Sequence, residues 1–172
     1  DVGSAKALQH LGFKALASTS AGFAWTTARA DNRVTVDDVC DHLTGICAAV
    51  DVPVNADFED GFAHEPEKVA VNVARAVKTG VAGLSIEDYT GDNARPLFDR
   101  DLAVERIKAA RKAIDAGTSG GLLTGRCAAF IRRARRLSRS FRWARSRRAS
   151  ARRSRRSATP ASSSFRARPT AS

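Results

Sequence analysis

The sequence predicts an α/β protein with a fold of the (β/α)8 barrel type. Four short apolar runs, beginning near residues 14, 52, 82 and 121, alternate with amphipathic segments. Such strict alternation indicates parallel strands joined by right-handed crossovers, as in a doubly wound sheet or a barrel. No Gly-x-Gly-x-x-Gly follows the first strand, which disfavours a dinucleotide-binding sheet. A complete barrel needs about 250 residues, so we expect an incomplete barrel of about four strand–helix units.

Each predicted element has a local signature. We expect strands over residues 13–20, 52–58, 81–88 and 121–126, and helices over residues 4–12, 35–50, 65–80 and 101–117. Thr35 suits the N-cap of the second helix, whose apolar residues fall on one stripe. Pro66 stands in the first turn of the third helix and Gly80 ends it, as helices favour.

Charge is distributed unevenly along the chain. Residues 132–172 contain 15 Arg and no Lys, Asp or Glu, whereas residues 1–131 carry 14 basic and 18 acidic side chains. Apolar periodicity also stops near residue 131. A segment of Arg, Ser and Ala cannot bury enough surface to fold, so we expect it to be disordered. The sequence therefore predicts a partial barrel over residues 1–131 and a basic tail over residues 132–172.

Two interpretations of the basic tail remain open. Out-of-frame reading of GC-rich codons gives text of this kind, and the change falls in the middle of the fold, so we favour this interpretation. In the alternative, the tail is a nucleic-acid-binding arm in which Arg neutralises phosphates and Phe141, Trp143 and Phe165 stack on bases. Nucleic acid is a partner only if the tail is genuine, which the coding DNA would decide.

Composition disfavours membrane and disulfide-rich classes. The chain has no run of about 18 apolar residues and no signal peptide, so we expect a cytoplasmic protein with no membrane partner. Cys40, Cys47 and Cys127 have no paired spacing, which argues against a disulfide framework. The chain has no Met and opens on "DVGSAKAL", so we expect the true start to lie upstream.

Acidic side chains close two of the predicted strands. Side chains alternate across a strand, so Asn55 and Asp57 share one face, as do Ser85 and Glu87. If the opposite apolar faces pack under helices, these side chains converge in the barrel mouth. Carboxylates held close together repel unless a cation offsets them, and oxygen ligands suit Mg²⁺ or Mn²⁺. The alternative is that these acids cap helices.

Four motifs together resemble the isocitrate lyase/phosphoenolpyruvate mutase superfamily. They are "DVGSAKALQHLGFKALASTSAGFAW", "VPVNADFEDGF", "GLSIEDYTGD" and "LLTGRCAAF", in this order and spacing. The resemblance implies a (β/α)8 barrel, a homo-oligomer with a swapped last helix, and Mg²⁺ as cofactor. It also implies that a C–C or P–C bond of a small 2-oxo or 2-hydroxy carboxylate is made or broken, through an enolate held on the metal.

The resemblance assigns roles to residues of the segments "STSAGFAW" and "ARADNR". Ser20, Ala21 and Gly22 correspond to a backbone cradle for the substrate's carboxylate or phosphoryl group. Trp25 either lines the mouth of the site, as a substrate-binding residue, or is part of the core. Asp31 corresponds to a catalytic acid on a mobile loop.

The resemblance also assigns roles to residues at the strand ends. Asp57 and Glu87 correspond to metal-site acids, and Asn55 stands where a further acid is usual, as a substrate-binding residue. Arg126 corresponds to a catalytic arginine that also binds the substrate, where its fork suits a carboxylate.

Two departures from the family pattern narrow the activity. "EDYTGDNARPLFDRDL" lacks the Cys and His of the loop on which the family's lyases depend, and Ala128 stands where a glutamate is usual. A mutase-like, decarboxylase-like or hydrolase-like member, of the carboxyvinyl-carboxyphosphonate or phosphoenolpyruvate phosphonomutase kind, is therefore favoured over an isocitrate or methylisocitrate lyase. Because the barrel is incomplete, we expect this chain to be a poor catalyst or none.

Overall fold

The computed structural model describes residues 1–92, 94–117 and 120–127. All of them belong to one compact unit, Asp1–Phe130. The predictions of a disordered tail and of an arm over residues 132–172 lie outside the described residues, as does Ala128. Among the described residues, no helix has the length and apolarity needed to cross a lipid bilayer.

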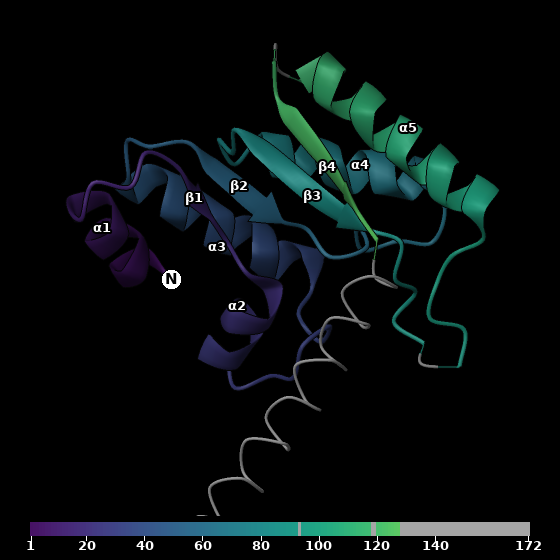
Figure 1. Cartoon of the computed structure of the whole chain (residues 1–172), viewed down its shortest axis with the longest axis horizontal. Coiled ribbons are helices and arrows are strands. Elements are labelled where there is room, and N and C mark those ends of the chain that lie inside the picture. The colour runs from purple at the N-terminus through teal and green to yellow at the C-terminus, as the bar shows by residue number, and fades with distance from the viewer. Residues whose placement is uncertain (93, 118–119, 128–172) are drawn as a thin grey trace, which may run out of the picture. The chain divides into compact units, whose positions relative to one another are not determined.

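The described residues form a parallel sheet of four strands, β1 (Leu16–Ala17), β2 (Val54–Asp57), β3 (Gly83–Glu87) and β4 (Leu122–Arg126), in the order β1-β2-β3-β4 (Figure 1). Strands that neighbour one another in sequence order, with no reversal, belong to a barrel and not to a doubly wound sheet. The predicted fold class is therefore confirmed as a partial barrel of this type.

The described part of the chain contains five helices: α1 (Val2–His10), α2 (Ser20–Thr26), α3 (Val36–Ala49), α4 (Pro66–Val77) and α5 (Arg100–Gly117). In Figure 1, α3 and α4 lie behind the sheet and α5 runs beside β4. The Thr35 hydroxyl accepts from the Asp38 N–H, and the Asp38 carboxylate accepts from the Thr35 N–H at 2.9 Å, so the predicted cap is a full capping box.

The helix α2 was not predicted, and the strand expected over residues 13–20 is wrong at both ends. Only Leu16–Ala17 pairs as a strand, and Ser20 already begins α2. The reason is local: Thr19 has an extended backbone, and its hydroxyl accepts from the Gly22 N–H, which caps a helix there. By composition, Ser18, Thr19 and Ser20 could continue a strand, but in the structure a helix starts there.

The predicted alternation along the strands is present. One face of β2 and β3 packs under the helices, where the core includes Ala56, Phe58, Leu84 and Ile86 with Val69, Val73, Ala110 and Ile114 of the helices. The other face of β2 carries the half-buried Asn55 and Asp57. The pleat thus sends the polar side chains away from the helices.

The sheet register depends on a glycine. A Cβ on Gly83 would lie 2.8 Å from the Leu122 Cβ and 3.0 Å from the Leu122 carbonyl oxygen, so β3 could not pair with β4 unchanged. A Cβ on Gly125 would meet only the Ile107 Cδ1, at 3.8 Å. Gly83 is therefore a packing requirement of the sheet, whereas Gly125 is not.

We predict that Gly83→Ala lowers the free energy of unfolding by about 1–3 kcal/mol, because overpacking a closed contact costs that much. Urea unfolding followed by circular dichroism measures the change. Gly125→Ala is the matched control and leaves the midpoint unchanged or raises it. Equal midpoints for Gly83→Ala and the unsubstituted chain would contradict the tight β3–β4 contact.

Candidate active site

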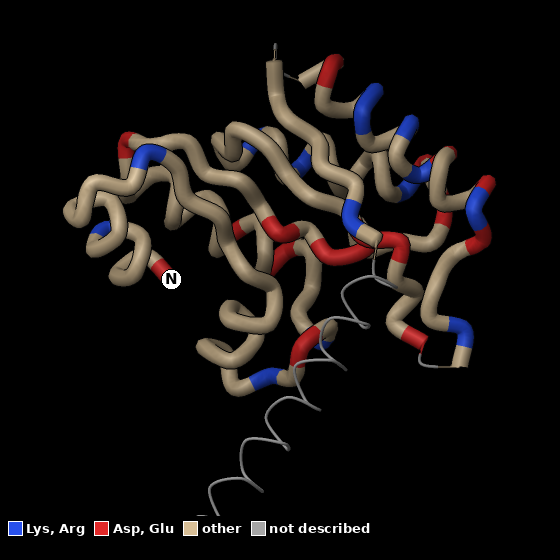
Figure 2. Tube along the Cα trace, viewed as in Figure 1, with Lys and Arg blue, Asp and Glu red and all other residues tan. Residues whose placement is uncertain are grey.

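Two carboxylates and one guanidinium meet at the carboxyl ends of the strands. Arg126 donates through Nη1 to the Asp57 Oδ1 at 2.5 Å and pairs through Nη2 with the Glu87 Oε1 at 2.7 Å. The register explains this, since Glu87 lies opposite Arg126 across β3 and β4. Figure 2 shows the acidic ends of β2 and β3 beside the basic end of β4. One cation therefore links Asp57 with Glu87.

The second carboxylate oxygen of Asp57 anchors α2. The Asp57 Oδ2 accepts from the Ser20 N–H at 3.0 Å and from the Ser20 hydroxyl at 3.1 Å. The Ser18 hydroxyl in turn accepts from the Asp57 N–H at 2.9 Å. Asp57 thus caps a helix, but that helix follows β1 and not its own strand. One carboxylate oxygen of Asp57 therefore caps α2, and the other pairs with Arg126.

Glu59 belongs to the same group of acids and was not predicted. Its side chain is 6% exposed, and its Oε1 is buried with no hydrogen-bond partner within the described residues. Burial is the largest cause that raises the pKa of Glu59; together with the charges of Asp31, Asp60, Asp57 and Glu87, in that order, it brings this pKa to about 8. Four other carboxylates are therefore close enough to influence the titration of Glu59.

Asp31 lies between α2 and α3 and joins this group from the side of the loop. Its Oδ1 is buried and has no hydrogen-bond partner within the described residues. After burial itself, the charge of Asp31 is the largest influence that raises the pKa of Glu59. The carboxylates of Asp31 and Glu59 are thus both desolvated and close, a costly arrangement that a cation would relieve.

The signal for Glu59 was present in "DFE", where two acids stand two residues apart. We expected the acid-x-acid position at Asn55 and Asp57 instead. In the structure Asn55 lies further back along β2, with its Oδ1 near Gly83 and its Nδ2 donating only a long bond of 3.5 Å to the Ala56 carbonyl. The structure therefore groups Asp57 with Glu59, and it places Asn55 apart from the ion pair.

The predicted backbone cradle lies in the first turn of α2. Ser20 contacts the acids through Asp57, as described above, and Ala21 and Gly22 follow it in the helix. A Cβ on Gly22 would lie 2.5 Å from the Thr19 Cγ2, so the helix cap alone requires this glycine. Trp25, further along α2, is 71% exposed and is therefore not a core residue.

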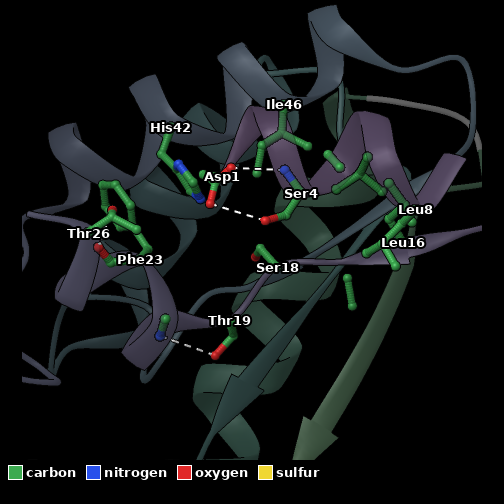
Figure 3. A pocket seen from close by; sticks show the side chains of 14 residues that line it. Asp1, Ser4, Leu8, Leu16, Ser18, Thr19, Phe23, Thr26, His42 and Ile46 are labelled. Carbon is green, nitrogen blue, oxygen red and sulfur yellow. Dashed lines mark hydrogen bonds between the residues drawn. The ribbon is translucent and has the colours of Figure 1, made fainter. Parts of the chain in front are cut away.

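Two cavities border this region, and neither contains all the acids. One of about 290 Å³ lies between α1, β1, α2 and α3, with Ser18, Thr19, Phe23 and His42 in its wall (Figure 3). The other, of about 530 Å³, is lined by Glu87, Arg126 and apolar side chains of α5. Because the titratable side chains gather at the strand ends, we place the candidate active site near the second cavity and not at the cavity in Figure 3.

The acids are chemically suitable ligands for a divalent cation, but in this structure they are not arranged around a single point. Within the described parts of the chain, no three Asp, Glu, His or Cys side chains already surround one point where a metal ion could sit. However, the Asp31 and Glu59 oxygens without partners are hard ligands, and Arg126 already brings Asp57 and Glu87 to a single positive charge. These residues therefore suit Mg²⁺ or Mn²⁺, provided that Arg126 turns away from one carboxylate.

We predict that Glu59→Gln flattens the pH dependence of stability in metal-free buffer. Because the folded pKa is raised from 4.5 to about 8, the stability contributed by protonated Glu59 is complete below pH 4.5 and is lost as the pH rises through 8. The slope for one proton is at most about 1.4 kcal/mol per pH unit. Urea unfolding across this pH range measures it.

Glu105→Gln, at an exposed carboxylate on α5, is the control and keeps the slope. If Glu59→Gln has the same pH profile as the unsubstituted chain, Glu59 is not buried as a protonated acid.

The described fold resembles solved structures. The chain is 43% identical to a putative lyase/mutase from Burkholderia cenocepacia J2315, with a TM-score of 0.72 over 74% of this chain and 46% of that one. For 2,3-dimethylmalate lyase, a PEP mutase/isocitrate lyase superfamily member, the identity is 32% and the TM-score 0.68, over 74% and 45%. For oxaloacetate acetylhydrolase in complex with oxalate they are 29% and 0.69, over 76% and 47%.

The chain thus spans about half the length of these relatives. A family profile described as phosphoenolpyruvate phosphomutase matches residues 1–151, which extends past the predicted boundary at residue 131. This match covers most of the chain and agrees with the structural relatives. The chain therefore belongs to the phosphoenolpyruvate phosphomutase family, within the PEP mutase/isocitrate lyase superfamily.

Proposed function

We propose that the chain is part of an enzyme that makes or breaks a C–C or P–C bond of a small 2-oxo carboxylate, with Mg²⁺ or Mn²⁺ as cofactor. The observation that carries this proposal is the group of buried and half-buried acids beside Arg126, in which Asp31 and Glu59 have buried oxygens without partners among the described residues. Its support is the family membership and the chemistry of these oxygen ligands.

Asp57, Glu59 and Glu87 would hold the divalent ion, and Asp31 would add a fourth carboxylate. When bound, such an ion offsets the negative charge that develops on the oxo and carboxylate oxygens of the substrate. The carboxylates themselves would keep the ion at the strand ends, where β2 pairs in parallel with β3. This assignment retains Asp57 and Glu87 from the sequence and adds Glu59.

Arg126 would bind the carboxylate of the substrate. Its fork already contacts two carboxylates, each through one nitrogen, which is the chemistry that a substrate carboxylate needs. Half-burial of the guanidinium strengthens such a contact relative to one in water. A substrate carboxylate would replace Asp57 or Glu87 as a partner of Arg126 and so release that acid to the cation.

The loop after β3 favours a hydrolase, decarboxylase or mutase reaction over a lyase reaction that depends on a cysteine. Residues 88–99 contain neither Cys nor His. The loop closes on itself, since the Thr90 N–H donates to the Pro96 carbonyl at 3.1 Å and the Phe98 N–H donates to the Asp88 carbonyl at 3.0 Å. The related oxaloacetate acetylhydrolase binds oxalate, so oxaloacetate and phosphonopyruvate-like acids are the first substrates to test.

We propose that catalysis requires a longer protein than this chain alone. Because the chain spans about half of its relatives, the other half of the barrel would supply the remaining walls of the site. We infer that the 172-residue chain alone is a poor catalyst. Oxaloacetate consumption that requires Mg²⁺, in a chain continued from residue 127 to the relatives' length, is the expected result.

We predict that the 172-residue chain binds Mn²⁺, and that Asp57→Asn and Glu87→Gln each weaken binding by at least about tenfold, since even indirect support of a metal site is worth that much. Electron paramagnetic resonance of free Mn²⁺ measures the affinity. Asp101→Asn, an exposed acid in the first turn of α5, is the matched control and leaves affinity unchanged. Equal affinities for all three variants would rule out this cation site.

A nucleic-acid-binding function has no support in the described residues, because the basic tail that suggested it lies outside them. It stays an alternative that a salt titration decides: electrostatic binding weakens steeply with salt.

A further inference from the structure

Arg106 is a buried arginine on α5 whose partners are carbonyl oxygens. Its side chain is 1% exposed. Nη1 donates to the carbonyls of Ala63 and His64, the latter at 2.6 Å, and Nη2 donates to the Asp60 carbonyl. Burial lowers the pKa of Arg106, although the charge of Asp60 opposes this. A buried cation that spends its donors on one loop fixes that loop in place.

The same guanidinium also reaches the loop after β3. It lies over the ring of Phe98, 3.9 Å from the ring centroid, and Phe98 in turn meets the ring of His64 edge-on at 5.2 Å. Arg106 therefore joins the loops that follow β2 and β3. These two loops begin directly after the metal-site candidates Asp57 and Glu87.

The loop held by Arg106 has an unfavourable backbone. Glu59, Gly61 and Phe62 all have positive φ angles, of 46°, 79° and 58°. Non-glycine residues at positive φ are costly and persist only where their surroundings enforce them. The turn has little support of its own, beyond a bond of 2.8 Å from the Gly61 N–H to the Phe58 carbonyl and the contact of the Asp60 carboxylate with the Phe62 N–H at 2.9 Å.

The unusual conformation of Glu59 places it against β3. The Glu59 carbonyl accepts from the Glu87 N–H at 2.7 Å, while its carboxylate lies buried among the other acids. If the loop relaxed to ordinary φ angles, the Glu59 side chain would leave this position, and the bond to Glu87 would break. The position of Glu59 therefore depends on contacts from outside the loop. On α4, the Asn72 Nδ2 donates to the carbonyls of Gly61 at 3.0 Å and Phe62 at 3.3 Å, and on α5, Arg106 holds the rest of the turn.

We propose that Arg106 is a positioning residue that holds the strained turn of residues 59–64 and thereby keeps Glu59 against Glu87, an inference that rests on the proposed function for the part that concerns the cation. Arginine suits this task because its planar fork reaches three carbonyls at once while stacking on Phe98. Lysine would keep the charge but could not reproduce this geometry.

The test uses the full 172-residue chain and the variants Arg106→Lys and Gly61→Ala. Gly61→Ala strains the same turn without touching Arg106, because a Cβ at φ 79° would also lie 3.1 Å from the Val69 Cγ1. Arg111→Lys is the matched control, since Arg111 on α5 donates to the Gly121 carbonyl at 2.7 Å, away from the turn. Amide hydrogen exchange and Mn²⁺ affinity are measured for each.

We expect Arg106→Lys and Gly61→Ala to lose protection at the amides of residue 61 and Glu87 and to bind Mn²⁺ at least about tenfold more weakly. Arg111→Lys should keep both properties. Should Arg106→Lys fail to fold, Arg106→Gln replaces it in the same measurements, since Gly61→Ala tests the turn but not the arginine.

Unchanged protection at Gly61 and Glu87 in Arg106→Lys overturns the proposal. Lost protection with unchanged Mn²⁺ affinity also overturns it, since the turn would then be structural only. If the unsubstituted chain binds no Mn²⁺, the proposed function fails, and hydrogen exchange alone decides whether Arg106 positions Glu59.

Discussion

The structure depends on keeping several like charges together at the end of a parallel sheet. Asp57 and Glu87 reach one guanidinium, that of Arg126, because the register of β2, β3 and β4 brings their carboxyl ends side by side. Carboxylates this close are unstable without positive charge. Arg126 supplies one charge, which leaves buried oxygens of Asp31 and Glu59 without a partner among the described residues. Burial first, and then the neighbouring negative charges, raise the pKa of Glu59 to about 8.

Sequence reasoning succeeded where a simple period applies. The alternation along β2 places Asn55 and Asp57 on the other face of the sheet from Ala56 and Phe58. This period of two residues is visible in the sequence itself. Strict strand–helix alternation likewise predicted that the strands pair in parallel. Both predictions follow from local geometry, and neither needs knowledge of distant contacts.

The same reasoning failed where the backbone leaves regular structure. Glu59 lies beyond the end of β2 with a φ of 46°, so the strand period says nothing about where its side chain points. The helix α2 was missed because Thr19 looks like a strand residue until its cap bond to Gly22 is known. Arg106 reads as a polar position of an amphipathic helix, and only the tertiary contacts with the turn at residues 60–64 explain its burial.

The central claim is that the strand-end acids gather round a divalent cation, and locating that ion tests it most directly. Crystals of the chain soaked in Mn²⁺ and measured at the manganese absorption edge would show an anomalous peak. The account predicts a single strong peak between Asp57, Glu59 and Glu87, with the Arg126 guanidinium turned away from at least one carboxylate. A peak elsewhere, or none with the Arg126 ion pairs intact, would contradict it.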